Sequence, residues 1–198
     1  MIYDVPAITA LARACAPEIA TEAVVPLVIT ESGGDPLQIN VNKGPRIRAR
    51  SVADGAALVR RYISAGYTVD VGLAQINSAN FARLGVTIEQ AFEPCANLRL
   101  ASIVLQHGYG LASRHYVGLD AISATYSLYN TGTLTGGFRN GYVGRVWTAA
   151  ATLGSVVAPP PTPVAATTVS PGSRPTARAD RDDWVVGPVP TGVVEVFK

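Results

Sequence analysis

Apolar positions recur at helical spacing through most of residues 1–153, and they predict a mainly helical body. The apolar run over 23–30 predicts a buried helix that ends at Glu31, because Gly33-Gly34 turns the chain immediately afterwards. Pro17 is expected to separate this helix from an earlier one, and Thr21 is expected to cap it. Further helices are expected over residues 53–65, from Pro94 through 105, over 119–129 and over 142–153.

Two segments of this body suit strands better than helices. Residues 46–51 and 67–71 are short, and they are consistent with a small β lobe. Helices combined with one small β lobe in a body of this length indicate an α+β fold. The sequence contains no internal repeat.

The composition changes sharply near Gly154. Residues 154–198 are rich in Pro, Ala, Thr, Ser and Arg and lack helical or strand periodicity. This predicts a disordered, proline-rich tail (154–198) that follows a single domain (1–153). The apolar segments around Trp184 and over 193–197 are candidate docking segments, although incidental composition explains them equally well.

Composition limits the classes of function that fit. The chain is 48% hydrophobic and 15% charged, so its body can bury a sizeable core. A net charge of +2 is too small to indicate a nucleic-acid partner, and Arg46, Arg48 and Arg50 are expected on a solvated face. No apolar stretch approaches the roughly 20 residues of a transmembrane helix, and no signal peptide is visible.

Two cysteines and two histidines cannot be assembled into a zinc site, so neither a metal nor a cofactor is expected. In an exported protein, Cys15 and Cys95 would form one disulfide. That bond would close a loop of about 80 residues and stabilise the fold by about 4 kcal/mol in the chain-entropy model. Two buried free thiols in a cytosolic protein are the alternative.

Glu31 is the main candidate for chemistry. A carboxyl group between a buried helix and a turn can have its backbone in the core and its side chain at the lip of a cleft. Partial desolvation there would raise its pKa, as a general acid working near neutral pH requires. The alternative is a solvated glutamate at a helix end.

Three further motifs place polar side chains beside glycine turns. Asp70-Val71-Gly72-Leu73-Ala74-Gln75-Ile76-Asn77 offers amide groups that suit sugars or N-acetyl groups. Tyr129-Asn130-Thr131-Gly132 places a phenol and an amide at a predicted helix end, and Tyr142-Val143-Gly144-Arg145-Val146 opens the last helix. Taken singly, each motif is also explained by turn chemistry or core packing.

Together with Glu31-Ser32, the order and spacing of these motifs resemble the soluble lytic transglycosylase family. Within it, the chain is most similar to the small lytic transglycosylase subunits of type IV secretion and conjugation systems. The closer resemblance lies in Cys15-Ala16-Pro17, Asp70-Val71-Gly72 and Pro94-Cys95-Ala96-Asn97-Leu98. It covers residues 10–151 and implies a mainly helical, lysozyme-like domain. It also favours the Cys15–Cys95 disulfide and a periplasmic location.

The resemblance implies that Glu31 is the single catalytic carboxylate. It would protonate the glycosidic oxygen between N-acetylmuramic acid and N-acetylglucosamine of peptidoglycan, and then activate the muramic C6 hydroxyl to close a 1,6-anhydro ring. Tyr129 would hold the Glu31 carboxyl group, whereas Tyr142 and Arg145 are expected to be structural. The expected substrate-binding residues are Ser32, Asn40, Gly72, Gln75, Asn77, Tyr129 and Asn130. The tail is a candidate for docking on secretion-channel components.

Two departures limit these expectations. Ala74 replaces the Met that is common in the family's glutamine motif, and residues 41–67 carry no matching motif. Asp70 is the best candidate for a second carboxylate, while Asp35 suits a turn. Two other functions stay open: a lysozyme-type hydrolase, in which water attacks the anomeric carbon, and an assembly factor that binds glycan without turnover.

Overall fold

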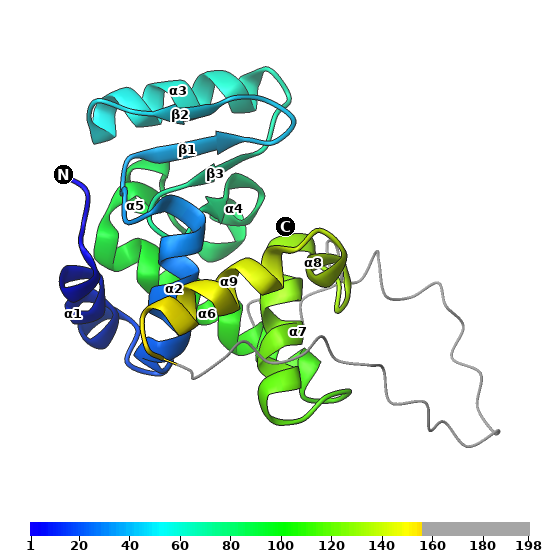
Figure 1. Ribbon diagram of the computed structural model, residues 1–198. Coiled ribbons are helices and arrows are strands. Elements are labelled where there is room, and N and C mark those ends of the chain that lie inside the picture. The colour runs from blue at the N-terminus through cyan, green and yellow to red at the C-terminus, as the bar shows by residue number, and fades with distance from the viewer. Residues whose placement is uncertain (156–198) are drawn as a thin grey trace, which may run out of the picture.

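The structure, a computed structural model, describes residues 1–155 of the 198-residue chain. Helices dominate, and a small antiparallel sheet lies at one end, which confirms the predicted α+β fold (Figure 1). The helices are α1 (Val5–Cys15), α2 (Thr21–Ser32), α3 (Val52–Ser64), α4 (Phe81–Leu84), α5 (Ile88–Phe92), α6 (Pro94–Ala112), α7 (Gly118–Thr131), α8 (Gly136–Arg139) and α9 (Tyr142–Thr152). The strands are β1 (Gln38–Val41), β2 (Arg46–Arg48), β3 (Val69–Val71) and β4 (Ile76–Asn77), and a 3₁₀ turn, η1, spans Ser78–Asn80.

Side-chain caps explain where several helices begin. Asp4, Ser51 and Thr87 each accept a hydrogen bond from the backbone N–H three residues later, at the starts of α1, α3 and α5. Helix α2 begins differently. Its N-cap is Ala20, which makes no side-chain cap, and Thr21 is already the first helical residue, so the predicted Thr21 cap is wrong.

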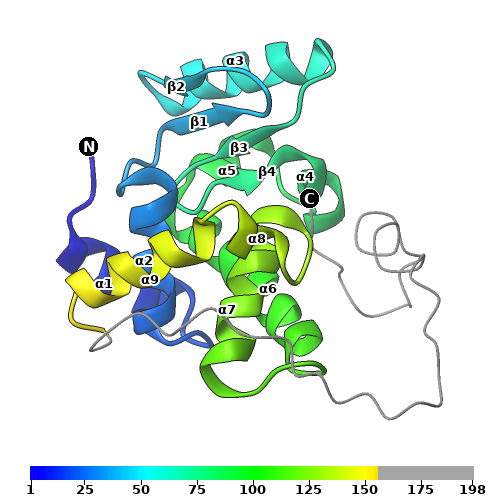
Figure 2. The same cartoon turned by 45° about the vertical axis from the view of Figure 1, so that its right-hand side comes forward.

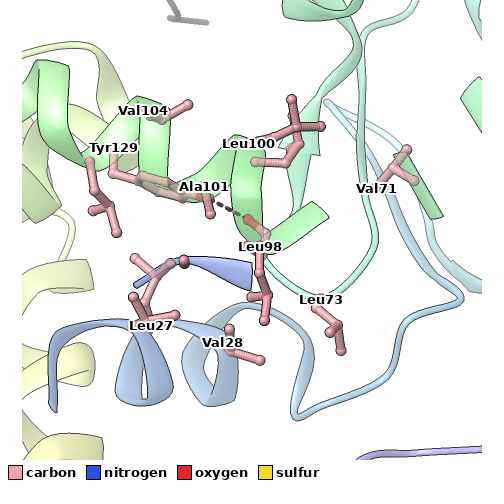
Figure 3. Close-up of a cluster of buried hydrophobic side chains, with 14 of the residues drawn as sticks. Leu27, Val28, Val71, Leu73, Leu98, Leu100, Ala101, Val104 and Tyr129 are labelled. Atoms are coloured by element: carbon pink, nitrogen blue, oxygen red, sulfur yellow. Dashed lines mark hydrogen bonds between the residues drawn. The ribbon is translucent and has the colours of Figure 1, made fainter. Parts of the chain in front are cut away.

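The core lies where α2, α6, α7 and α9 meet. Helix α2 lies beside α9 in both views, although the two are far apart in sequence (Figures 1 and 2). Leu27 and Val28 of α2 are fully buried and lie opposite Leu98 and Ala101 of α6, with Leu73 beside them (Figure 3). Their burial fixes the backbone of α2 up to its last turn.

The sheet has the strand order β2-β1-β3-β4, with every neighbouring pair antiparallel. Directly paired residues share a face, and successive residues of a strand alternate between faces. One face therefore carries an apolar row that joins the core, made up of Ile47, Ile39, Val71 and Ile76. The other carries a row of Arg46, Asn40, Asp70 and Asn77, called the polar row below.

The sequence predicted the long elements better than the short ones. The predicted strands at 46–51 and 67–71 exist as the shorter β2 and β3, while β1 and β4 were not predicted. The helices predicted at 53–65, from Pro94, at 119–129 and at 142–153 are present as α3, α6, α7 and α9.

The predicted tail, apart from Gly154 and Ser155, lies outside the described residues. Within residues 1–155, no helix has the length and apolar character needed to cross a bilayer.

Candidate functional site

Glu31 occupies the last turn of α2, where the helical core meets the sheet. The helix ends one residue later, and Gly33 follows in the left-handed conformation (φ 63°), which a residue without Cβ adopts readily. Arg46 of β2 donates to the Glu31 carbonyl oxygen over 3.1 Å, so the sheet is tied to this turn. The side chain of Glu31 is half-buried. The predicted setting, with the backbone anchored and the carboxyl group at a junction, is therefore present.

Tyr142 holds the Glu31 carboxyl group. Its phenol oxygen donates to Oε1 of Glu31 over 2.5 Å, and only 3% of Tyr142 is exposed. Burial raises the pKa of the Tyr142 phenol well above its usual value, and the charge of Glu31 raises it further. Tyr142 therefore remains a neutral hydrogen-bond donor over the whole working pH range.

This contact corrects the sequence prediction. Tyr142 was expected to be structural, and Tyr129 was expected to hold the carboxyl group. The Tyr129 phenol instead donates to the carbonyl oxygen of Ala74 over 2.6 Å. A phenol has one proton to donate, so the hydrogen bond to Glu31 belongs to Tyr142. Tyr129 is nevertheless close to the site, because its pKa is raised by burial first and then by the charges of Glu31 and Asp70.

Tyr142 is positioned by a turn that joins two helices. The side chain of Asn140 accepts from the backbone N–H of Tyr142 over 2.9 Å and donates to Asn130, at the end of α7, over 2.8 Å. Asn130 is therefore linked to Tyr142 through Asn140. Its predicted contact with substrate stays a prediction.

Ser32 contacts the loop that follows β3, and Gly72 is the first residue of this loop. The Ser32 hydroxyl donates to the carbonyl oxygen of Leu73 over 2.7 Å. Gly72 has a φ of 81°, and a Cβ there would lie 2.5 Å from Nδ2 of Asn97, so only glycine fits. The Ser32 and Tyr129 hydroxyls thus both hold the loop that follows β3.

Asn97 fastens the same loop from the other side, a role that the sequence prediction missed. Its fully buried amide donates to the carbonyl oxygens of Val71 (2.9 Å) and Ala91 (2.7 Å) and accepts from the N–H of Ala74 (2.7 Å). The motif Pro94-Cys95-Ala96-Asn97-Leu98 carried the resemblance, and its asparagine is explained by these three bonds. The sequence signal that could have indicated this role is a polar residue in the first turns of a buried helix.

Asp70 lies in the polar row between two amides. Nδ2 of Asn40 donates to one carboxylate oxygen over 3.2 Å, and Nδ2 of Asn77 donates to the other over 2.7 Å. The three predicted residues are therefore brought together. Both asparagines use an amide N–H within the protein, and their expected contacts with sugar stay predictions.

Gln75 is buried in an unusual backbone conformation. It has a φ of 51°, and its amide donates to the carbonyl oxygens of Gln38 (3.1 Å) and Gly72 (2.9 Å). Its Oε1 has no hydrogen-bond partner among the described residues. The side chain thus stabilises the glutamine motif itself, and its predicted binding of sugar stays a prediction.

Asp35 has a turn role, as expected. One carboxylate oxygen accepts from the N–H of Leu37, and the other forms an ion pair with Arg48 over 2.5 Å. Its charge is therefore paired with a cation of β2.

The predicted disulfide is present. Cys15 at the end of α1 is bonded to Cys95 in the first turn of α6, and the two Cα atoms are 5.2 Å apart. It anchors the turn of α6 that also carries Asn97. Within residues 1–155, no group of three or more His, Cys, Asp or Glu side chains is arranged to hold a metal ion.

The site can carry out acid–base chemistry with one carboxyl group. Glu31 is partly accessible and is oriented by a neutral phenol, an arrangement compatible with general acid–base chemistry. Asp70, the other nearby carboxylate, is almost completely buried, at 5% exposed.

Comparison with known proteins identifies the family. A family profile described as the transglycosylase SLT domain matches residues 9–148. The protein virB1 of Rhizobium radiobacter is 37% identical over 152 residues, which cover 76% of this chain and 64% of that protein. The type IV secretion system protein virB1 of Brucella abortus is 36% identical over 132 residues, 65% of this chain and 56% of that protein.

The matched region therefore spans less than two thirds of the length of each of these relatives. No solved structure matches this chain. The profile match and the relatives show that the chain belongs to the family of transglycosylase SLT domain proteins.

Proposed function

We propose that this protein is a peptidoglycan lytic transglycosylase, which cleaves the β-1,4 bond between N-acetylmuramic acid and N-acetylglucosamine with formation of 1,6-anhydromuramic ends. The observation that carries the proposal is the half-buried Glu31 held by Tyr142 within an SLT domain. A single oriented carboxyl group fits a reaction in which one residue acts first as acid and then as base.

The reaction runs in two proton transfers. Protonated Glu31 gives its proton to the glycosidic oxygen, the bond from that oxygen to the muramic C1 breaks, and N-acetylglucosamine leaves as an alcohol. The Glu31 carboxylate then takes the proton of the muramic C6 hydroxyl, and O6 forms a bond to C1. Glu31 ends protonated, as it began, and no water is consumed. Tyr142 keeps the carboxyl group in one orientation through both steps.

The substrate contacts complete the proposal. Ser32, Gly72 and Tyr129 shape the loop beside Glu31, and the polar row supplies amides on the facing sheet. The glycan would lie between them, with Asn40, Gln75, Asn77 and Asn130 in supporting positions.

The names of the relatives support a proposal for the cellular role. Two of them are called virB1, and one is named a type IV secretion system protein. We place this protein in the periplasm, where it would open the wall locally for a secretion or conjugation apparatus. The disulfide fits an oxidising compartment.

The test is product analysis by mass spectrometry. Purified sacculi are incubated with the wild-type protein and with Glu31→Gln, which keeps the side-chain shape and an oxygen for Tyr142. Anhydro-muropeptides from the wild type alone would support the proposal. Reducing-end products would identify a hydrolase. No products from either protein, together with complementation of a secretion defect by Glu31→Gln, would identify a glycan-binding assembly factor.

A further inference from the structure

Asp70 is a buried carboxylate that the proposed reaction does not use. It is 5% exposed, and each of its two oxygens accepts an amide N–H, from Asn40 and from Asn77. Neither ion pair found within residues 1–155 includes it. The two amide donors fix the orientation of the carboxylate, and neither Arg48 nor Arg60, the cations of those two ion pairs, contacts it. The side chain is therefore an oriented negative charge.

This charge faces the side of the sheet on which Glu31 lies. Asp70 shares the polar row with Arg46, and Arg46 donates to the Glu31 carbonyl oxygen. The apolar row points the other way, into the core with Val59 of α3. Tyr129 is within electrostatic reach of both carboxylates, since its pKa is raised by burial and then by Glu31 and Asp70. Tyr129 thus senses the charge of both Glu31 and Asp70.

If Asp70 served only to link the neighbouring strands, its side chain would not need a charge. A neutral amide could link the asparagines of the neighbouring strands, and it would avoid the free energy needed to remove an anion from water. Cleavage of a glycosidic bond builds positive charge on the anomeric carbon and the ring oxygen. An oriented, poorly solvated anion stabilises such a charge strongly.

We propose that Asp70 stays ionised during the reaction and stabilises the positive charge that develops at the muramic anomeric carbon. This inference rests on the proposed function, and it adds a second carboxylate with a different task from that of Glu31. Asp70 acts through its charge, and transfers no proton. Asn40 and Asn77 orient it.

The first variant is Asp70→Asn, which removes the charge and keeps the shape. Its amide can still accept from Asn77, and a half-turn of the Asn40 amide lets it donate there, so the hydrogen bonds can be retained. The control is Asp35→Asn, a second buried aspartate whose charge is paired with Arg48. Rates on soluble glycan strands are measured for both, with folded fractions from urea unfolding.

Asp70→Asn is expected to lower kcat by on the order of tenfold to a hundredfold, with KM nearly unchanged and anhydro ends still formed. Asp35→Asn is expected to lower stability and leave kcat near the wild-type value. A kcat of Asp70→Asn within about twofold of the wild type would overturn the inference. A wild-type protein that forms no anhydro ends would instead overturn the proposed function.

The pH profile separates charge from structure. The groups that interact with Glu31 include Tyr142 of α9, Tyr129 of α7 and Arg46 of β2, and Asp70 of β3 interacts with Tyr129 as well. Loss of a nearby anion disfavours protonated Glu31, so the alkaline limb of kcat/KM should move to lower pH in Asp70→Asn. The limb should not move in Asp35→Asn. An unmoved limb in Asp70→Asn would contradict a role through charge.

Chemical rescue provides a test that does not depend on Asp70→Asn. Asp70→Ala leaves a space that formate can enter, with the same two amides as donors. Added formate is expected to restore activity severalfold, whereas formamide, which is neutral and of similar shape, is expected to restore none. Equal rescue by both, or rescue by neither in a folded Asp70→Ala protein, would overturn the inference.

Discussion

The phenol of Tyr142 donates to the carboxyl group of Glu31 over 2.5 Å, although the two residues are 111 positions apart. Glu31 is at the end of α2 and Tyr142 at the start of α9, and these helices lie side by side in both views (Figures 1 and 2). The packing of two helices therefore determines how the acid is oriented. The following predictions concern this contact and the parts of the fold that support it.

Tyr142→Phe should reduce kcat by about tenfold or more, because the Glu31 carboxyl group loses the hydrogen bond that orients it. The ring remains, so the protein should fold. The matched control is Tyr126→Phe, since the Tyr126 phenol donates to the Ala23 carbonyl oxygen and not to Glu31. That variant should lose about 1 kcal/mol of unfolding free energy and keep its kcat. Equal kcat values in wild type and Tyr142→Phe would show that the contact is not needed.

Stability should fall steeply above pH 10. Burial raises the phenol pKa values of Tyr126, Tyr129 and Tyr142, and Glu31 raises the last two further. Above pH 10 the unfolded chain loses these protons and the folded chain keeps them, so the folded state binds more protons and its stability decreases as pH rises. Below pH 10 both states are protonated, and the contribution is constant.

Three such phenols lower the free energy of unfolding by as much as about 4 kcal/mol per pH unit in this window. Urea unfolding in steps from pH 9 upward measures the slope. Tyr142→Phe should reduce the slope by one proton. A free energy of unfolding that stays flat above pH 10 would contradict the burial of these phenols.

Gly72→Ala should destabilise the protein by about 2 kcal/mol or more. The new Cβ would meet Nδ2 of Asn97 at 2.5 Å and the Ala91 carbonyl oxygen at 2.8 Å, in a left-handed backbone conformation. Gly66→Ala is the control, because Gly66 has a similar φ of 86° with nothing within 4 Å of the added Cβ. It should lose only about 1 kcal/mol from backbone strain. Similar losses in urea unfolding for both variants would exclude the clash with Asn97.

Reduction of Cys15–Cys95 should lower the free energy of unfolding by about 4 kcal/mol, because the bond closes a long loop in the unfolded chain. The double variant Cys15→Ala/Cys95→Ala should have the same stability with and without reductant. Wild-type protein in reductant should approach that value. A wild-type urea midpoint that reductant leaves unchanged would contradict the prediction.

The sequence predicted the position of Glu31 because the local signals agree: a buried apolar run followed by two glycines. It did not predict the Tyr142 contact, since periodicity shows which face of a helix is buried but not which helix covers it. The assignment of the carboxyl contact to Tyr129 failed for the same reason. The Tyr129 phenol instead donates to the carbonyl oxygen of Ala74, which lies in a loop that is distant in the sequence.

The short strands β1 and β4 also could not be predicted from the sequence. Strand β4 has two residues and β1 has four, too few for the alternation of a strand to be recognised. The polar row depends on the register of these strands. Asp70 could therefore be named as a candidate carboxylate, but its pairing with Asn40 and Asn77 could not be predicted.

The most direct measurement is a digestion of glycan strands in water enriched in ¹⁸O, followed by mass spectrometry of the new muramic ends. Attack by the C6 hydroxyl forms an anhydro ring and uses no water. We therefore expect new ends that contain no ¹⁸O and lack one water relative to reducing ends, and no new ends from Glu31→Gln. Muramic ends that carry ¹⁸O at C1 from the first turnovers would show hydrolysis and contradict the proposed reaction.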